Sequence, residues 1–128
     1  MAELTSAALD IIRQYASLLE TVEEGLDYVT ASFADPQRRH ADRLLADILL
    51  ALGKIGETNV YLEQLFAEES DFVRQLERFA DVLDAAEALD GKFADAAAKE
   101  QIVRGWLSPA FQAWKIAVEG GLRRYLVQ

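Results

Sequence analysis

The chain of 128 residues contains no cysteine and one histidine. Without cysteine it has no disulfides, thiolate metal sites or cysteine nucleophiles, which is consistent with a reducing compartment. A bundle-type di-iron site needs Glu-x-x-His pairs, and the residue three before His40 is Gln37 rather than a glutamate. We therefore expect no metal and no cofactor. We interpret His40 as an exposed polar residue near a helix start rather than as a proton carrier.

Long apolar runs and an excess of positive charge are also missing. The longest stretch without a charged side chain, Gly105 to Trp114, is about half of what a membrane-spanning helix needs. No basic region precedes an apolar run near the N-terminus, so we expect no secretory signal and a cytoplasmic protein. The 13 basic and 22 acidic side chains give a net charge of −9. Because this charge repels phosphate backbones and anionic lipids, we expect no binding to nucleic acid or membranes.

Apolar residues are abundant, at 52% of the chain, and the length suits one domain, which we expect to span residues 1–128. Their spacing alternates steps of three and four, which predicts helices, and no window alternates with a period of two, so we expect no strands. The first seam comprises Leu4, Ala8, Ile11, Tyr15, Leu18, Val22, Gly25 and Val29, flanked by Ile12, Leu19, Leu26 and Phe33. The second comprises Ala41, Leu45, Ile48, Leu52, Ile55, Asn59, Leu62 and Phe66.

Two shorter apolar stripes follow. One runs through Phe72, Leu76, Phe79, Leu83 and Ala86, and the other through Phe111, Trp114, Val118, Leu122 and Tyr125. Between them, residues 91–107 lack a clean stripe, so a short helix, a ragged extension or a loop all stay open. We expect the aromatic residues Trp106, Phe111, Trp114 and Tyr125 mainly in the core, with a recognition surface as the alternative.

Helix boundaries are marked by capping residues. Asp35-Pro36 and Ser108-Pro109 each place an N-cap residue before a proline, which predicts two helix starts. Ser70 is a third candidate cap, and Thr5 or Ser6 could cap the first helix. Asp90-Gly91 predicts a helix stop.

Four helical segments joined by short turns predict an all-α, antiparallel up-and-down four-helix bundle, whose last arm combines a short helix with a C-terminal helix. In length, acidity and expected architecture the chain is similar to the flagellar export chaperones, although no motif of that family falls on particular residues here. The resemblance implies that such a bundle can bind helical client proteins.

Acidic clusters are the remaining candidates for ion binding. Glu20, Glu23, Glu24 and Asp27 lie close together in the first helix, and Asp81, Asp84 and Glu87 lie in the third. A straight helix cannot wrap the six to eight oxygens of a calcium site around one point, so we interpret both clusters as solvated faces. No nucleophile elbow, phosphate-binding loop or dinucleotide fingerprint is present. We expect a protein that is not an enzyme.

A second apolar stripe on the second predicted helix, which is expected to begin at Pro36, is the best candidate for a binding surface. Small and apolar residues recur there on a side that the main seam does not cover. Two glycines within one turn cost helix stability, which implies either the close approach of another backbone or a local kink. The stripe is either a second contact inside the bundle or an interface with a homodimer partner or another protein. Its candidate partner-binding residues are Leu49, Leu50, Gly53, Gly56 and Val60.

Polar and aromatic seam residues support an alternative function. Asn59 at a seam position either sets helix pairing or contacts a ligand. Together with Tyr15, Trp114 and Tyr125 it could line a site for a small apolar ligand inside the core. Gly25 and Gly121 on the inner seams could leave room for such a ligand, whereas Gly53 and Gly56 lie mostly outside. We therefore favour a protein-interaction, adaptor or chaperone-like module over a ligand-binding bundle.

Overall fold

The computed structural model describes residues 4–35 and 40–126, and within these ranges all regular structure is helical. Two long helices come first and shorter ones follow. The elements are α1 (Ser6–Ser32), α2 (Ala41–Leu65), α3 (Ser70–Glu77), α4 (Phe79–Ala88), α5 (Ala96–Ile102), the π-helical turn η1 (Val103–Leu107) and α6 (Ser108–Leu126). None of the described helices is long and apolar enough to span a membrane.

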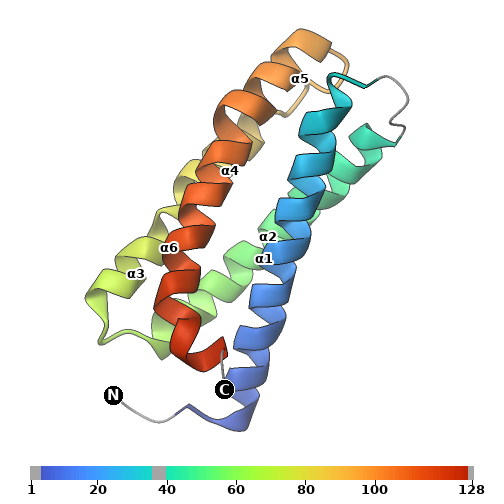
Figure 1. Cartoon of the computed structure of the whole chain (residues 1–128). Coiled ribbons are helices and arrows are strands. Elements are labelled where there is room, and N and C mark those ends of the chain that lie inside the picture. Colours follow the sequence, from blue (N-terminus) through green and yellow to red (C-terminus); the bar gives the residue numbers. More distant parts are fainter. Residues whose placement is uncertain (1–3, 36–39, 127–128) are drawn as a thin grey trace.

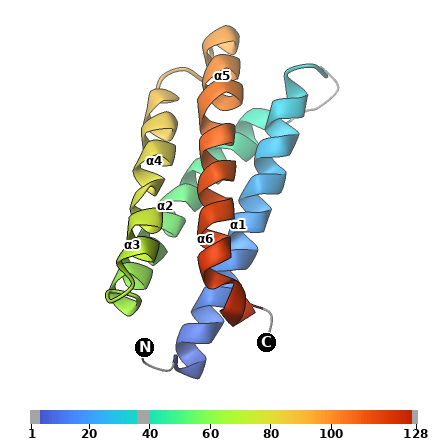
Figure 2. The same cartoon turned by 60° about the vertical axis from the view of Figure 1, so that its left-hand side comes forward.

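These elements form four antiparallel arms arranged in a ring (Figures 1 and 2). α1 packs against α2 on one side and α6 on the other, while α3 and α4 together form the arm between α2 and α6. The fourth arm runs from α5 through η1 into α6 without a break (Figure 2). The prediction of an all-α four-helix bundle with a composite last arm is confirmed.

The core lies along the predicted seams, with one shift of register in α1. Ile12, Leu19 and Leu26, expected as flanking residues, are fully buried, whereas Ile11 and Leu18 of the expected main seam are half-buried. In α2 every predicted seam residue from Leu45 to Phe66 is buried. Periodicity identifies the apolar face of a helix, which here includes both the main seam and the flanking residues. The packing of the neighbouring helices decides which of these two sets of residues is fully buried.

Only some of the predicted helix boundaries are correct. Thr5 caps α1 by accepting a hydrogen bond from the Ala8 N–H at 3.0 Å. The predicted start at Asp35-Pro36 is wrong, because α2 begins at Ala41 with His40 in the cap position; Pro36 lies outside the described residues. Ser70 is the first residue of α3 rather than its cap. Gly91 does adopt the left-handed conformation (φ +74°) that ends the third arm.

The start predicted at Ser108-Pro109 is also wrong, because the chain is already helical from α5 onward. Asp95 caps α5 by accepting a hydrogen bond from the Ala98 N–H, which resolves the ambiguous stretch before Leu107 largely as helix. Just before Pro109 the helix widens into η1, where the Ser108 N–H donates to the Val103 carbonyl. A proline inside a helix clashes with the carbonyl four residues earlier, and the wider turn accommodates its ring.

The third arm contains a break that the sequence does not mark. α3 ends at Glu77 and α4 begins at Phe79, with Arg78 between them at φ −64° and ψ −10°. No proline or glycine lies between residues 70 and 88. The two halves nevertheless bury one continuous face, which includes Phe72, Leu76, Phe79 and Val82.

Candidate partner-binding surface

The outward face of α2 carries the most exposed large apolar side chain in the described part of the chain. Leu50 is 76% exposed and Val60 is 55% exposed. Gly53, which lies between them on the helix surface, has no neighbouring atom within 4 Å of the position that a Cβ would occupy. These three predicted site residues thus lie together on open surface.

The other two predicted residues, Leu49 and Gly56, lie at the edge of this face, against the third arm. Leu49 is half-buried against the core. A Cβ on Gly56 would lie 3.9 Å from Cε2 of Phe79, which is ordinary van der Waals contact. The stripe is therefore an internal contact along one edge only, and within residues 4–35 and 40–126 no backbone packs against Gly53.

Leu83 extends the surface onto α4, and sequence reasoning assigned it to the core. It lies one turn after Phe79, on the side of α4 that faces α2, yet it is 41% exposed. α2 and α4 run antiparallel (Figure 2), and Leu83 follows Phe79, the neighbour of Gly56, by one turn toward the end of α4. We name this surface the α2–α4 face and define it by Leu49, Leu50, Gly53, Gly56, Val60 and Leu83.

Three of the four residues proposed to line a ligand site, Tyr15, Asn59 and Trp114, meet in the core. The Tyr15 hydroxyl of α1 donates to Asn59 Oδ1 of α2 at 2.5 Å, and burial raises the pKa of Tyr15, which keeps this donor protonated. Trp114 packs edge-on against Tyr15, with ring centroids 6.5 Å apart. Tyr125 lies away from this group and packs against Phe66. Asn59 thus pairs α1 with α2, as the structural interpretation predicted.

Two donors of this group have no partner. Asn59 Nδ2 and Trp114 Nε1 are buried and make no hydrogen bond within the described part of the chain. Trp114 also lines a surface hollow of about 400 Å³ between the third arm and α6. The rest of this hollow is formed by Ala80, Ala110, Ala113, Ala117, Gln75, Arg78 and Asp81. Trp106, expected mainly in the core, lies partly exposed near this hollow and donates to Asp81 Oδ1 at 3.1 Å.

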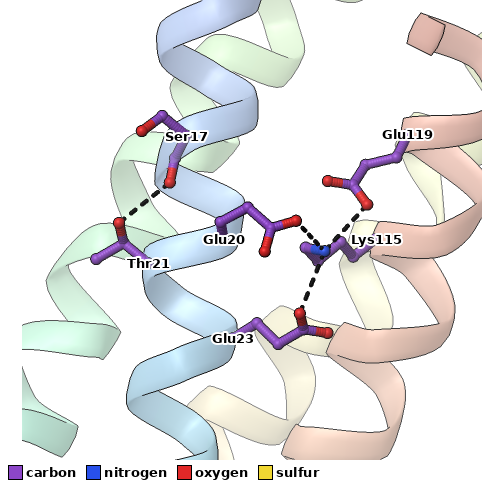
Figure 3. A network of polar contacts seen from close by, with 6 residues as sticks. All are labelled: Ser17, Glu20, Thr21, Glu23, Lys115 and Glu119. Atoms are coloured by element: carbon purple, nitrogen blue, oxygen red, sulfur yellow. Dashed lines mark hydrogen bonds and ion pairs between the residues drawn. The ribbon is translucent and has the colours of Figure 1, made fainter.

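A buried lysine that the sequence patterns did not predict joins α1 to α6 (Figure 3). Lys115 is 5% exposed, and its Nζ lies 2.8 Å from Glu20, 3.3 Å from Glu23 and 3.0 Å from Glu119. Glu20 is exposed, as the solvated-face interpretation predicted, whereas Glu23 is half-buried, and both carboxylates pair with Lys115. The spacing of Lys115 from Phe111, four residues, already places it on the buried side of α6.

The electrostatics of this cluster keep its charges fixed. Burial by itself lowers the pKa of Lys115, but hydrogen bonds to Glu20, Glu119 and Glu23 outweigh burial and raise that pKa above its ordinary value. The hydrogen bond from Lys115 likewise lowers the pKa of Glu20. A lysine held permanently charged cannot act as a general base near neutral pH, so the cluster is a structural clamp between two arms.

The described ranges contain no group of histidine and carboxylate side chains arranged to hold a metal ion. His40 is exposed at the cap position of α2, as predicted, and has a left-handed backbone (φ 65°).

Comparison with known proteins places the chain in a family. No curated protein and no solved structure is significantly similar to it. The profile of one family, described as a domain of unknown function (DUF8042), matches residues 10–117, from the first turns of α1 to the middle of α6. The chain therefore belongs to the DUF8042 family.

Proposed function

We propose that this protein is a non-catalytic protein-interaction module of the cytoplasm, of adaptor or chaperone-like type, and that it binds its partner through the α2–α4 face. The observation that supports this proposal is the open surface around Gly53, bordered by two strongly exposed side chains, Leu50 and Val60. Exposed apolar side chains gathered on one face of a helix can mark interaction sites in soluble proteins.

The face also has a shape that suits binding. Burying an exposed leucine or valine side chain contributes about 2 kcal/mol each, so Leu50, Val60 and Leu83 together supply useful affinity. Gly53 lies flush with the helix backbone and leaves space for a partner side chain to sit between Leu50 and Val60. Apolar anchors around a shallow gap are typical of the helix-on-helix contacts by which bundles bind.

Site-specific photocrosslinking tests this function. A benzophenone amino acid is placed at Leu50 and, as a matched control, at Ile116, which is 70% exposed on α6. We expect covalent protein adducts in cells from position 50 and few or none from position 116. The proposal fails if position 50 gives no adduct above background, or if both positions give the same adducts in equal yield.

The mass of the adduct and of the free protein identifies the type of partner. A homodimer gives an adduct of twice 14.3 kDa and a solution mass that rises to the same value with concentration in light scattering. Another protein gives an adduct of different mass and a monomeric solution mass.

Binding of a small apolar ligand is the second candidate function. It is supported by Trp114, whose buried Nε1 has no hydrogen-bond partner among the described residues. Trp114 also lines the hollow of about 400 Å³, a volume within the range of small-molecule sites. Replacing Ala113 with Trp fills this hollow. If the second function holds, solvent extraction of the purified wild type yields a stoichiometric apolar compound by mass spectrometry, and extraction of the Ala113→Trp variant does not.

A further inference from the structure

Carboxylates without ion-pair partners border the α2–α4 face. Glu57 lies one turn from Gly53 and Val60 on α2, and Glu63 lies two turns after Gly56. On α4, Glu87 lies one turn after Leu83, and Asp84 is the exposed residue that directly follows Leu83. None of these four carboxylates forms an ion pair or hydrogen bond within residues 4–35 and 40–126.

Cations near the face do not balance these charges. The outer side of α2 also carries Asp47, Arg43 and Lys54, all exposed and without ion pairs in the described ranges. The border therefore holds five carboxylates and two cations, on a chain whose net charge is −9. By contrast, Glu20 and Glu23, on α1, are occupied by Lys115.

From this arrangement we infer that the partner on the α2–α4 face is an amphipathic helix of another protein with lysine or arginine beside its apolar stripe. The inference rests on the proposed function, because it names the class of partner for the same face. Apolar anchors supply the affinity, while the unpaired carboxylates select and attract a basic partner.

A second copy of this chain suits the face less well. In a two-fold symmetric dimer the same surface meets itself, so the carboxylates of both copies gather around one contact. Ten carboxylates would then face four cations, and like charges brought together disfavour association. A basic helix instead meets Glu57 and Glu63, which flank Val60 on opposite sides of α2, together with Asp84 and Glu87 on α4.

The dimensions of the face fit a short helix. From Leu49 to Val60 the helix rises about 17 Å, or roughly three turns, at 1.5 Å per residue. A partner with apolar residues at positions i, i+3 or i+4, and i+7 presents anchors over the same length. About 18 residues are enough to span the face with one turn to spare at each end.

Binding of designed peptides tests the inference. Two fluorescently labelled helical peptides of about 18 residues share one apolar stripe, and one carries lysines beside it where the other carries glutamates. Fluorescence anisotropy with the full chain measures their dissociation constants at low and high salt. We expect the lysine peptide to bind about tenfold or more tightly than the glutamate peptide, with a difference that shrinks as salt screens the charges.

Matched variants locate the binding. Leu50→Ser removes an anchor, with Ile116→Ser as control, because both residues are exposed apolar side chains on helices. The double variant Glu57→Lys/Asp84→Lys reverses two charges at the border of the face. The double variant Glu24→Lys/Asp27→Lys on α1 makes the same change in net charge away from the face and is the control. We expect Leu50→Ser and the charge reversal each to raise the dissociation constant of the lysine peptide about tenfold. Each control should change this constant less than about twofold.

Other outcomes distinguish a failure of this inference from a failure of the proposed function. If both peptides bind equally and Leu50→Ser abolishes both, the face binds proteins but the charge selection is wrong. If the chain forms a dimer that Leu50→Ser breaks and Ile116→Ser does not, the occupant is a second copy and the inference is overturned. If neither peptide binds and position 50 gives no crosslink, both the inference and the proposed function fail.

Discussion

Two glycines in similar helical patterns, Gly121 on α6 and Gly53 on α2, have opposite surroundings. A Cβ on Gly121 would fall well inside 3.0 Å of the Phe72 ring, so a side chain there would clash with α3. A Cβ on Gly53 would meet nothing within 4 Å. A small residue on an amphipathic helix can therefore mean that two helices pack closely, or that a surface is open. A glycine on an open surface is the better candidate for a functional site, because helix packing does not require a glycine at that position.

The largest effect is expected from placing the same side chain at both glycines. Gly121→Leu forces the Phe72 ring to move and should lower the free energy of unfolding by about 3 kcal/mol, because overpacking strains a filled core. Gly53→Leu should raise the free energy of unfolding by up to about 1 kcal/mol, because leucine has a higher helix propensity than glycine. Urea titration followed by circular dichroism measures both changes.

Changes of opposite sign in the free energy of unfolding at Gly121 and Gly53 would support the contrast between a closed and an open glycine site. A loss of stability in Gly53→Leu as large as that in Gly121→Leu would mean that α2 has a close neighbour at Gly53, contrary to the open surface. Gly53→Leu should also reduce crosslinking at Leu50, because the added side chain occupies the gap beside Val60.

The next largest effect concerns the closed interior between α1 and α2. Tyr15→Phe removes the donor to Asn59 Oδ1 and leaves a buried acceptor without a partner, so we expect a loss of about 2 kcal/mol. The double variant Tyr15→Phe/Asn59→Leu removes both polar groups and should recover part of this loss. Equal stability of the single and double variants would show that the hydrogen bond contributes little to pairing the two helices.

The clamp between α1 and α6 should produce a smaller effect that depends on pH. Glu20 has a pKa below its ordinary value in the folded state, so its contribution to stability is present above the pKa of the unfolded chain. That contribution is lost as the pH falls through the folded value. Lys115→Met removes the cation, and we expect a loss of about 1 kcal/mol at neutral pH, because the three glutamates are partly exposed and return to water.

The pH profile distinguishes this clamp from simple loss of packing. Stability of the wild type relative to Lys115→Met should decline on acidification below the ordinary glutamate range, because protonated carboxyls no longer attract Lys115. Chemical denaturation at a series of pH values provides the measurement. A constant difference between the two proteins down to strongly acidic pH would show that the lysine acts through its aliphatic stem alone.

Much of the fold follows from periodicity, and the exceptions have local causes. The two long helices and the chain reversal at Gly91 were predictable because apolar spacing persists over many turns and glycine adopts a left-handed conformation readily. The helix start at Ser108-Pro109 was mispredicted because the π turn η1 lets a helix pass through a proline. The break at Arg78 leaves no trace in composition, so no local rule finds it.

The candidate surface was predicted in part, for a similar reason. Spacing identified Leu50 and Val60 as outward-facing, because helix geometry alone decides which side of α2 they occupy. Leu83 was assigned to the core, because periodicity does not show how closely α2 and α4 approach. The pairing of Lys115 with Glu20 depends on how α6 sits against α1, 95 residues away in sequence. Long-range packing of this kind is not encoded in any single helix.

The smallest expected effect comes from Gly25, which lies between the two extremes. A Cβ there would lie 3.0 Å from Cδ1 and 3.2 Å from Cγ1 of Ile48, so the Ile48 side chain must shift by only a few tenths of an ångström. The gain of about 1 kcal/mol in helix propensity should then offset the crowding, so Gly25→Ala is expected to change the free energy of unfolding by less than about 0.5 kcal/mol. Urea titration beside Gly53→Ala, where only the gain applies, measures the difference. A loss at Gly25 comparable to that at Gly121 would mean that Ile48 is held rigidly, and that the α1–α2 seam is as tightly packed as the contact of α6 with Phe72.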